Sequence, residues 1–370
     1  MKFALATPEH DPALRRLARD EGMPGPVRLA YTREPDWFAG QAAIGHLQQT
    51  VVALDARGEV AGAGVRALRR VFVNGEPREV GYLGGLRSLP RVRGGLGLAQ
   101  GYRFLRALHT ADNRAPAYLT TILESNAPAR TLLVSGRAGL PAYHDLGRVH
   151  TRPWFRLPSP RSQLPAGVTL RQAPSPPPRD LLAYLRREGA KRQFFPVLDE
   201  AAFSADPWRL FNSGEFCLAA RGNEIIGVVG CWDQRAFRQL RVTGYAPALA
   251  GLRPALNGLA RLAGRRALPA LPPAGHTLDA CFATCVCVTD DAPVIFDALM
   301  RRLCARARDG GRGLLLVSLH ERSPLNAAFS PLERLLDCRS RLYCACWEDG
   351  EPFVGSLDPA RIPHVEGAML

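Results

Sequence analysis

A loop rich in glycine and arginine carries the clearest chemistry in the sequence. Residues 91–97 read Arg-Val-Arg-Gly-Gly-Leu-Gly; a mostly apolar stretch that begins at Gly81 precedes them, and a run with helical spacing that ends at His109 follows. Glycines let several backbone N–H groups converge on one point, while the helix N-terminus and two arginines add positive charge. A strand, such a loop and a helix in succession predict a phosphate or pyrophosphate site. An ordinary turn is the alternative.

Two other phosphate-binding motifs do not fit this loop. A Walker loop needs Gly-Lys-Ser/Thr, and the sequence has lysine only at Lys2 and Lys191. A dinucleotide fingerprint needs an acidic residue at the end of a second strand, about 20 residues further on. Asp112 stands near that distance, but it follows the end of a helical run and no strand precedes it.

A third motif fits better. The loop resembles the pyrophosphate-binding signature of the GCN5-related N-acetyltransferases, Arg/Gln-x-x-Gly-x-Gly/Ala, between the fourth strand and third helix of that family. The match is partial, because alignment on Gly95-Leu96-Gly97 places Val92 where the family has arginine or glutamine. Asn126-x-x-Ala129 is similar to the family's second motif, at the start of its fourth helix.

The resemblance implies acetyl-CoA as cosubstrate. The pyrophosphate would sit on the N–H groups of residues 93–97, and the pantetheine would lie along the strand that ends at residues 86–89. The acyl carbonyl would be polarised by a strand N–H near Gly84-Gly85, where paired glycines indicate a bulge or a close backbone approach. The cofactor contacts implied in this way are Leu86, Arg87, Ser88, Leu89, Arg91, Arg93, Gly94, Gly95, Leu96, Gly97 and Asn126.

Catalysis in this family needs an amine but no covalent intermediate. A neutral amine attacks directly, which calls for a base, often through water. Glu124 is the first candidate for this base and Glu79 the second. Many members use a tyrosine seven residues after the motif asparagine to protonate the departing thiolate; Leu133 stands there, and Tyr143 and Tyr118 are nearby replacements. A structural role is the alternative for each of these residues.

Composition restricts the class of protein and its partners. The chain has 370 residues, 46% of them hydrophobic and 22% charged, with a formal net charge of +14. Such a charge favours anionic partners: a CoA-type cofactor, an acidic substrate or carrier protein, or nucleic acid. Nucleic acid is disfavoured, because no basic block carries interleaved aromatic residues. The absence of a long apolar run and of a signal peptide leads us to expect a cytoplasmic protein that does not enter a membrane.

The nine cysteines all follow residue 216 and show no metal-binding spacing. No Cys-x-x-Cys pair occurs, and the eight histidines do not cluster near the cysteines. We expect small buried apolar residues rather than a disulfide framework or a metal site.

The order of predicted elements repeats. The resemblance covers about residues 2–157, and a similar succession of strands and helices recurs after a proline-rich linker. We therefore predict an α/β fold of two tandem domains, each a mixed, mostly antiparallel sheet flanked by helices. The expected division is a catalytic domain at 1–157 that resembles the GCN5-related N-acetyltransferases (GNAT), a linker at 158–167, a degenerate GNAT-like copy at 168–350 and a C-terminal tail at 351–370.

The second copy lacks the cofactor loop. Asp290-Asp291 stand where the first copy has its glycines and arginines, and two carboxylates would cap the helix themselves and repel a pyrophosphate. We expect this copy, with the insertion Ala246 to Gly275, to shape the substrate cleft. The predicted function is N-acyl transfer from acetyl-CoA to an amine of a small molecule or peptide. The alternatives are a carrier-protein or longer acyl-CoA donor, or a non-catalytic CoA-binding protein.

Overall fold

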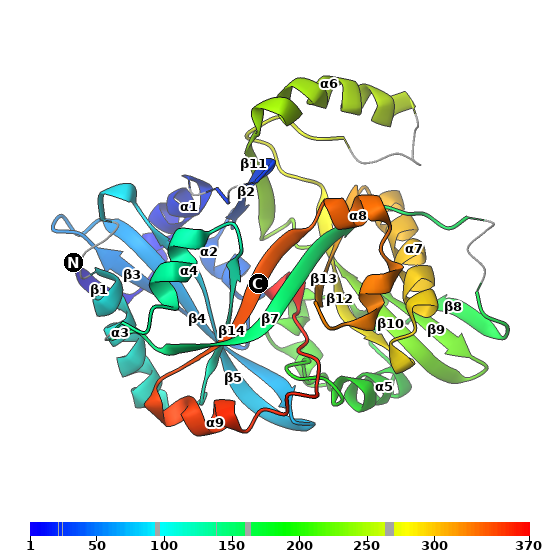
Figure 1. Ribbon diagram of the computed structural model, residues 1–370, viewed down its shortest axis with the longest axis horizontal. Coiled ribbons are helices and arrows are strands. Elements are labelled where there is room, and N and C mark those ends of the chain that lie inside the picture. Colours follow the sequence, from blue (N-terminus) through cyan, green and yellow to red (C-terminus); the bar gives the residue numbers. More distant parts are fainter. Residues whose placement is uncertain (21, 24, 93–96, 138, 160–163, 263–269) are drawn as a thin grey trace.

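A single mixed sheet of 12 strands runs across the whole molecule, as the computed structural model shows (Figure 1). The structure describes residues 1–20, 22–23, 25–92, 97–137, 139–159, 164–262 and 270–370. The strands, in their order across the sheet, are β1 (Lys2–Leu5), β3 (Leu47–Leu54), β4 (Val60–Val73), β5 (Glu76–Ser88), β6 (Tyr118–Leu123), β14 (Cys338–Cys346), β7 (Ala142–Trp154), β13 (Leu314–His320), β12 (Ala280–Val288), β10 (Glu224–Trp232), β9 (Phe216–Arg221) and β8 (Val168–Gln172).

The two predicted domain ranges, 1–157 and 168–350, exchange strands in the middle of this sheet. The last strand, β14, lies between β6 and β7 and is antiparallel to both, while β7 pairs on its other side with β13. Thus β14, from the second half of the chain, lies between two strands of the first half. In turn β7, from the first half, lies between two strands of the second half. Hydrogen bonding is continuous from β1 to β8, so the mixed sheets expected for the two domains join edge to edge in one sheet.

Helices cover both faces of the sheet. In the first half, α1 (Asp11–Asp20) and α2 (Trp37–Gln41) pack on the face that carries Tyr82, whereas α3 (Gly97–Asp112) and α4 (Ala127–Leu133) pack on the face that carries Leu83. In the second half, α5 (Arg179–Gly189) and α7 (Pro293–Asp309) cover opposite faces. The short helices α8 (Pro331–Leu335) and α9 (Glu351–Gly355) follow later in the chain. Within the described residues, none of the helices combines the length and apolar character that a bilayer-spanning helix requires.

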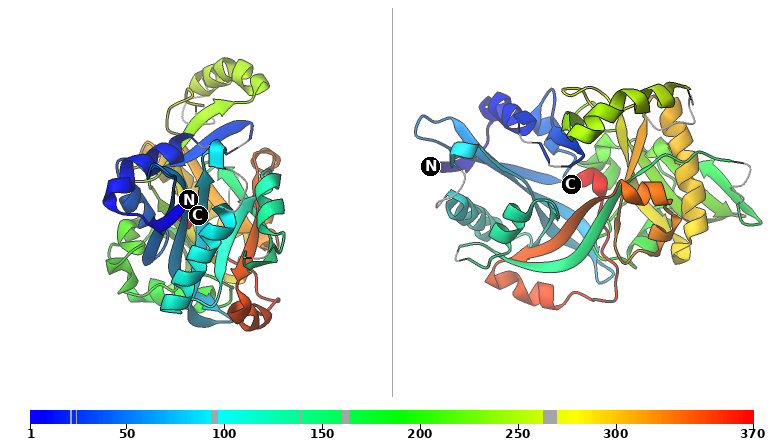
Figure 2. Two further views of the ribbon diagram at one scale, coloured as in Figure 1. Left: turned by 90° about the vertical axis from the view of Figure 1, so that its left-hand side faces the viewer. Right: turned by 45° about the horizontal axis from the view of Figure 1, so that its top comes forward.

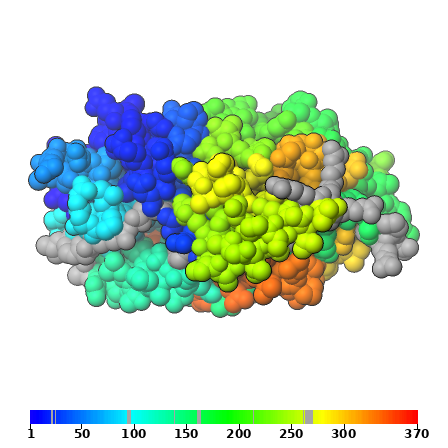
Figure 3. All heavy atoms as spheres, turned by 90° about the horizontal axis from the view of Figure 1, so that it is seen from above, coloured from blue at the N-terminus to red at the C-terminus, as the bar shows by residue number. Residues whose placement is uncertain are grey.

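A second, two-stranded sheet joins the halves at one side. β2 (Val27–Thr32) pairs with β11 (Gln239–Tyr245), and α6 (Pro247–Leu262) continues from β11 above the main body (Figures 1 and 2). Seen from above, α6 lies across the middle of the molecule, beside the N-terminal segment (Figure 3).

The segment predicted as a C-terminal tail, 351–370, packs between the halves. The N–H of His364 donates to the carbonyl of Gln193, and that of Gln193 to the carbonyl of Ile362. Val365, Ala368 and Met369 are buried in the core. These residues therefore belong to the folded body and not to a loose end.

The cysteines lie where their expected role as small apolar residues places them. All except Cys338 are buried, and no disulfide is present among the described residues. Burial raises the pKa of thiols such as those of Cys287 and Cys344 to about 12. They are therefore neutral at physiological pH.

Candidate active site

The parallel strands β5 and β6 pair only briefly and then diverge. Their register covers Gly81↔Tyr118 and Tyr82↔Leu119, and no later β5–β6 pair is present among the described residues. Beyond that point β5 stays with β4 as far as Ser88, while β6 pairs with β14. A wedge therefore opens between the two strands, and we call it the first wedge. A parallel strand pair that splays in this way offers main-chain groups to an inserted ligand.

A bulge in β5 lies beside this wedge. Val65 pairs with Gly84 and Ala63 with Arg87, so that Gly85 and Leu86 together oppose one residue of β4. Gly85 has φ +61°, a left-handed conformation that glycine adopts without strain. The bulge predicted from the two glycines is confirmed, and Leu86 is exposed.

Gly81 closes the apex of the wedge. A Cβ atom at this position would lie 2.1 Å from the ring of Tyr118. Only glycine lets the buried Tyr118 pack there, where its hydroxyl accepts from Nε of Arg66 at 2.9 Å. The apex is thus fixed by packing that no larger residue would permit.

The predicted cofactor residues occupy several environments. Residues 93–96 lie outside the described residues, and Gly97 begins α3. Arg91 forms an ion pair with Asp55 at 2.7 Å. The side chain of Arg87 donates to the carbonyls of Ala18 and Tyr31, so it lies on the α1 face rather than in the wedge.

The remaining predicted cofactor contacts lie at the two ends of the wedge. Leu89 donates its N–H to Ala61 at 2.9 Å, and Ser88 pairs with Gly62, so this end of β5 is held by β4. Asn126 caps α4, where its side chain accepts from the N–H of Ala129 at 3.3 Å.

The three predicted catalytic residues are not brought together. Glu124 pairs with Nε of Arg148 at 2.7 Å, in an open polar hollow of about 420 Å³ that also involves Arg130 and Arg341. Glu79 lies before the apex on β5 and binds His46 at 3.0 Å and Arg114 at 2.8 Å. The two glutamates line different hollows, so at most one of them can serve a given reacting group.

Tyr143 lies on the opposite face of the sheet from Tyr82. Its hydroxyl is 2.6 Å from that of Tyr102, within the cluster that contains α3 and α4. Burial raises the pKa of Tyr143, and burial also raises that of Tyr102 to about 12. Both hydroxyls therefore keep their protons at neutral pH, as a proton donor must.

A cavity of about 300 Å³ adjoins the apex on the α1 face. Tyr82, Leu119 and Thr121 line it on the sheet side, and Glu79 and His46 line its edge. The second half closes the cavity with residues that had not been predicted: Phe194, Val197, Asp199, Asp206, Trp208, His364, Glu366, Met369 and Leu370. Of the described residues of the insertion Ala246 to Gly275, none lines this cavity, and the role of the insertion as a cleft wall stays a prediction.

Arg69 forms the cationic side of the cavity. Its guanidinium lies 3.9 Å above the ring of Tyr82 and donates to the carbonyls of Ile44 and Met369. Burial lowers the pKa of Arg69 to about 10, and the residue remains charged at neutral pH. The cavity thus combines a fixed positive charge with the carboxylates of Glu79 and Glu366.

A second wedge exists between β12 and β13, and the chain fills it. These parallel strands pair over three residue pairs, from Ala280↔Leu314 to Phe282↔Leu316, before they diverge. Glu366 accepts from the N–H of Cys285 at 2.9 Å, and the turn Gly367–Met369 packs directly against Ser318 and the core. No comparable segment of the described chain enters the first wedge.

The predicted helix capping by Asp290 and Asp291 is wrong. Both residues lie in a separate turn with positive φ, and α7 begins after Ala292 without a side-chain cap. Asp291 binds Arg192 instead. The second wedge is therefore closed by the C-terminal segment that fills it, and Asp291 in the acidic turn is already paired with Arg192.

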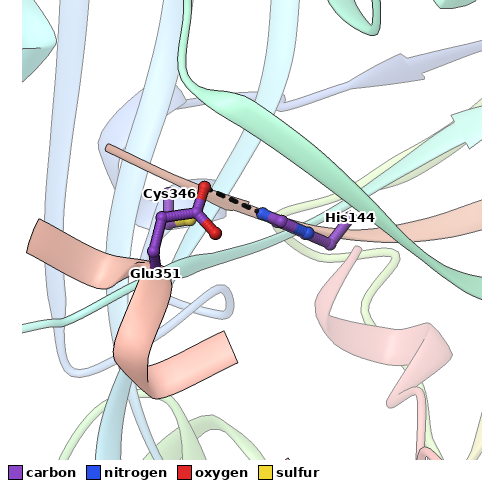
Figure 4. A group of neighbouring side chains, drawn as sticks. All are labelled: His144, Cys346 and Glu351. Atoms are coloured by element: carbon purple, nitrogen blue, oxygen red, sulfur yellow. Dashed lines mark hydrogen bonds and ion pairs between the residues drawn. The ribbon is translucent and has the colours of Figure 1, made fainter. Parts of the chain in front are cut away.

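One group of side chains could hold a metal ion. The ligand atoms of His144, Cys346 and Glu351 lie within 4.8 Å of one another, with His144 Nε2 3.1 Å from Glu351 (Figure 4). Burial and the nearby carboxylate of Glu351 raise the pKa of Cys346 to about 12, which opposes the thiolate that a metal needs. The expectation of no bound metal stays a prediction, which elemental analysis of the purified protein would check.

Comparison with known proteins rests on structure. No protein-family model matches the sequence, and a search of curated proteins finds no relative. A GCN5-related N-acetyltransferase from Sphaerobacter thermophilus matches 93% of this chain and 94% of its own, with a TM-score of 0.54 and 14% identity. N-myristoyltransferase from Saccharomyces cerevisiae, with bound myristoyl-CoA and inhibitors, matches 98% of this chain and 86% of its own, with a TM-score of 0.56 and 10% identity. The chain therefore has the fold of the GCN5-related N-acetyltransferases, with its mixed sheet and flanking helices.

Proposed function

We propose that the protein transfers an acyl group from acetyl-CoA to a primary amine, with the thioester bound in the first wedge. The observation that carries this proposal is the open wedge beside a glycine bulge, followed by the glycine-arginine loop. The pantetheine would lie along the β6-facing edge of β5, and N–H groups at the bulge would polarise the thioester carbonyl.

The cavity on the α1 face would hold the amine. Tyr82 and Leu119 belong both to the apex of the wedge and to the cavity lining, so an amine there would approach the acyl carbon from the Tyr82 face. The amine nitrogen would form a bond to that carbon, and the C–S bond would break to release the CoA thiolate. Tyr143 would supply the proton for this thiolate.

Glu79 suits the role of base better than Glu124 does. Glu79 lines the cavity and lies within hydrogen-bond distance of His46, so that the pair could accept the amine proton through water. Glu124 lines a hollow that contains neither Tyr82 nor Leu119.

Thiol release from acetyl-CoA, measured against a panel of amines, tests the proposal. We expect release that depends on the amine, and a fall of about 100-fold in kcat for Glu79→Gln. A fall in kcat for the matched Glu124→Gln variant, with no fall for Glu79→Gln, would instead identify Glu124 as the base. Binding of CoA without any release would favour the non-catalytic alternative.

A carrier protein as acyl donor is the second candidate. The formal net charge of +14 favours an acidic donor of this kind. Turnover with an acyl carrier protein should then fall steeply as salt is raised, whereas turnover with free acetyl-CoA should fall less.

A further inference from the structure

Helix α6 exposes its leucines, while a polar side chain of the same helix binds the chain beside it. Leu252, Leu256 and Leu259 recur at the spacing of one helix face and are 59%, 40% and 63% exposed. The side-chain amide of Asn257 donates to the carbonyl of Leu271 at 2.9 Å, and its oxygen accepts from the N–H of Leu271 at 2.8 Å. A surface helix normally has the opposite arrangement, with its leucines toward the core. The three leucines therefore form an apolar stripe, which we call the leucine stripe.

The leucine stripe belongs to the outermost element on one side of the molecule. α6 continues from the two-stranded sheet of β2 and β11 and stands above the main body (Figure 1). Seen from above, it lies across the middle of this face (Figure 3). A flat surface that approaches this face would therefore meet α6 first.

Positive charge accompanies the leucine stripe. The insertion that contains α6, residues 246–275, has four arginines and neither aspartate nor glutamate. Arg28 donates to the carbonyl of Tyr245 at 3.1 Å, and the guanidinium of Arg253 lies 5.8 Å from the ring of the same tyrosine. Among the described residues, no Asp or Glu side chain forms an ion pair with Arg28 or Arg253. The charges near the start of α6 are therefore complementary to an anionic surface.

This combination fits an anionic lipid bilayer better than it fits a second copy of the chain. A helix with leucines on one face and arginines nearby can lie in the plane of the bilayer interface, with its leucines at the acyl boundary and its cations among the headgroups. Two copies joined through α6 would instead bring two insertions together that carry arginine and no acidic residue. Like charges that face each other across an interface oppose association.

We infer that α6 binds the protein to the surface of anionic lipid membranes through the leucine stripe. The expectation that the protein does not enter a membrane rests on the lack of a long apolar run, and a helix that lies in the headgroup region needs no such run. The inference goes beyond the proposed acyl transfer, because no described residue of α6 lines the cavity beside the first wedge.

Co-sedimentation of the full chain with vesicles gives the first test. One set of vesicles consists of phosphatidylcholine, and the other of equal parts of phosphatidylcholine and phosphatidylglycerol. We expect binding to the mixed vesicles to be at least about tenfold tighter, with a difference that shrinks as salt is raised. Equal binding to both sets, or binding to neither, would overturn the inference.

Replacing leucines of the stripe gives the second test. Leu252→Gln/Leu259→Gln should bind the mixed vesicles at least about tenfold more weakly than the wild type. Its Tm should not change, because both side chains are exposed. The matched control Leu132→Gln/Val294→Gln removes exposed apolar side chains of α4 and α7 and should bind as the wild type does. Equal affinity of the two double variants would overturn the inference.

A fluorescent reporter tests the same contact without removing apolar surface. The emission of Leu259→Trp should shift to shorter wavelength when mixed vesicles are added, relative to the wild type, whose five tryptophans are buried. An unchanged spectrum would overturn the inference even if Leu252→Gln/Leu259→Gln proved unstable.

Sedimentation without vesicles tests the other occupant of the stripe. We expect the wild type and Leu252→Gln/Leu259→Gln to have the same mass in solution. A wild-type dimer that this variant dissociates would identify a second copy as the occupant and would overturn the inference. Thiol release from acetyl-CoA by soluble protein is measured separately, so the loss of either activity can be recognised while the other persists.

Discussion

The two wedges of this molecule have the same backbone and different occupants. In β5, Gly85 and Leu86 oppose one residue of β4; in β12, Cys285 and Val286 oppose one residue of β10 in the same way. Gly85 and Cys285 even share a left-handed conformation, with φ of +61° and +51°. Glu366 binds the N–H of Cys285 and the turn 367–369 fills the second wedge, whereas no described segment fills the first.

Closure of the second wedge therefore depends on the C-terminal segment rather than on the strands. The bulge that would serve a thioester is present in both wedges, and a cysteine tolerates the strained conformation in the second because its N–H gains a carboxylate partner. The two wedges thus share their strand geometry, and the C-terminal segment distinguishes them.

The largest expected effect comes from separating the copies. Fragment Met1–Leu157 lacks β13 and β14, so β6 loses one neighbour and β7 loses both. Unpaired strands with apolar faces aggregate. We expect the fragment to be insoluble or largely unfolded by circular dichroism, even as a solubility fusion, while the full chain is folded. A stable, active fragment would show that the two copies are independent.

Cofactor binding should be confined to the first wedge. Gly95→Asp places a carboxylate where the predicted pyrophosphate approaches the backbone, so we expect acetyl-CoA affinity to fall by about 2 kcal/mol or more. Calorimetry on the wild type should give one site per chain. Two equivalent sites, or affinity retained in Gly95→Asp, would remove the functional difference between the wedges.

Local patterns predicted the elements of the first wedge well. The strand before the loop, the bulge and the helix after the loop all follow from neighbouring residues, such as the glycine pair and the spacing of Leu98 and Tyr102. The position of β14 between β6 and β7 could not be predicted. The residue patterns of β7 and β14 suit an antiparallel neighbour of β6 equally well.

The candidate site was predictable only in part, because long-range contacts complete it. Glu79 was named from the sequence, whereas Trp208 and Glu366 reach the same cavity from positions more than 100 residues away.

A smaller effect should follow from loosening the closed wedge. Glu366→Ala leaves the buried N–H of Cys285 without its acceptor, which should lower the free energy of unfolding by about 1–3 kcal/mol in urea. Glu366→Gln retains an oxygen acceptor and should lose less. Equal losses in both variants would mean that charge, rather than the hydrogen bond to Cys285, holds the C-terminal segment in place.

The smallest effect concerns the residues beside each apex. Arg66 and Cys231 occupy equivalent positions, since Arg66 pairs with Leu83 and Cys231 with Ala283. Arg66 binds Asp112 at 2.7 and 2.8 Å, whereas Cys231 lies 3.3 Å from Cys281 in apolar surroundings. The first apex therefore contains an ion pair and the second does not.

Acid should weaken the first apex selectively. Burial by itself would raise the pKa of Asp112, but the hydrogen bonds and charge of Arg66 outweigh it and lower the pKa. A carboxylate with a lowered folded pKa adds stability above its unfolded pKa of about 3.9, and this stability is lost as pH falls through the folded value. Between pH 6 and pH 3, Asp112→Asn should therefore lose about 1 kcal/mol less than the wild type. The control Glu59→Gln removes an exposed carboxylate and should follow the wild type; if Asp112→Asn did so too, the pair would not contribute to the pH dependence of stability.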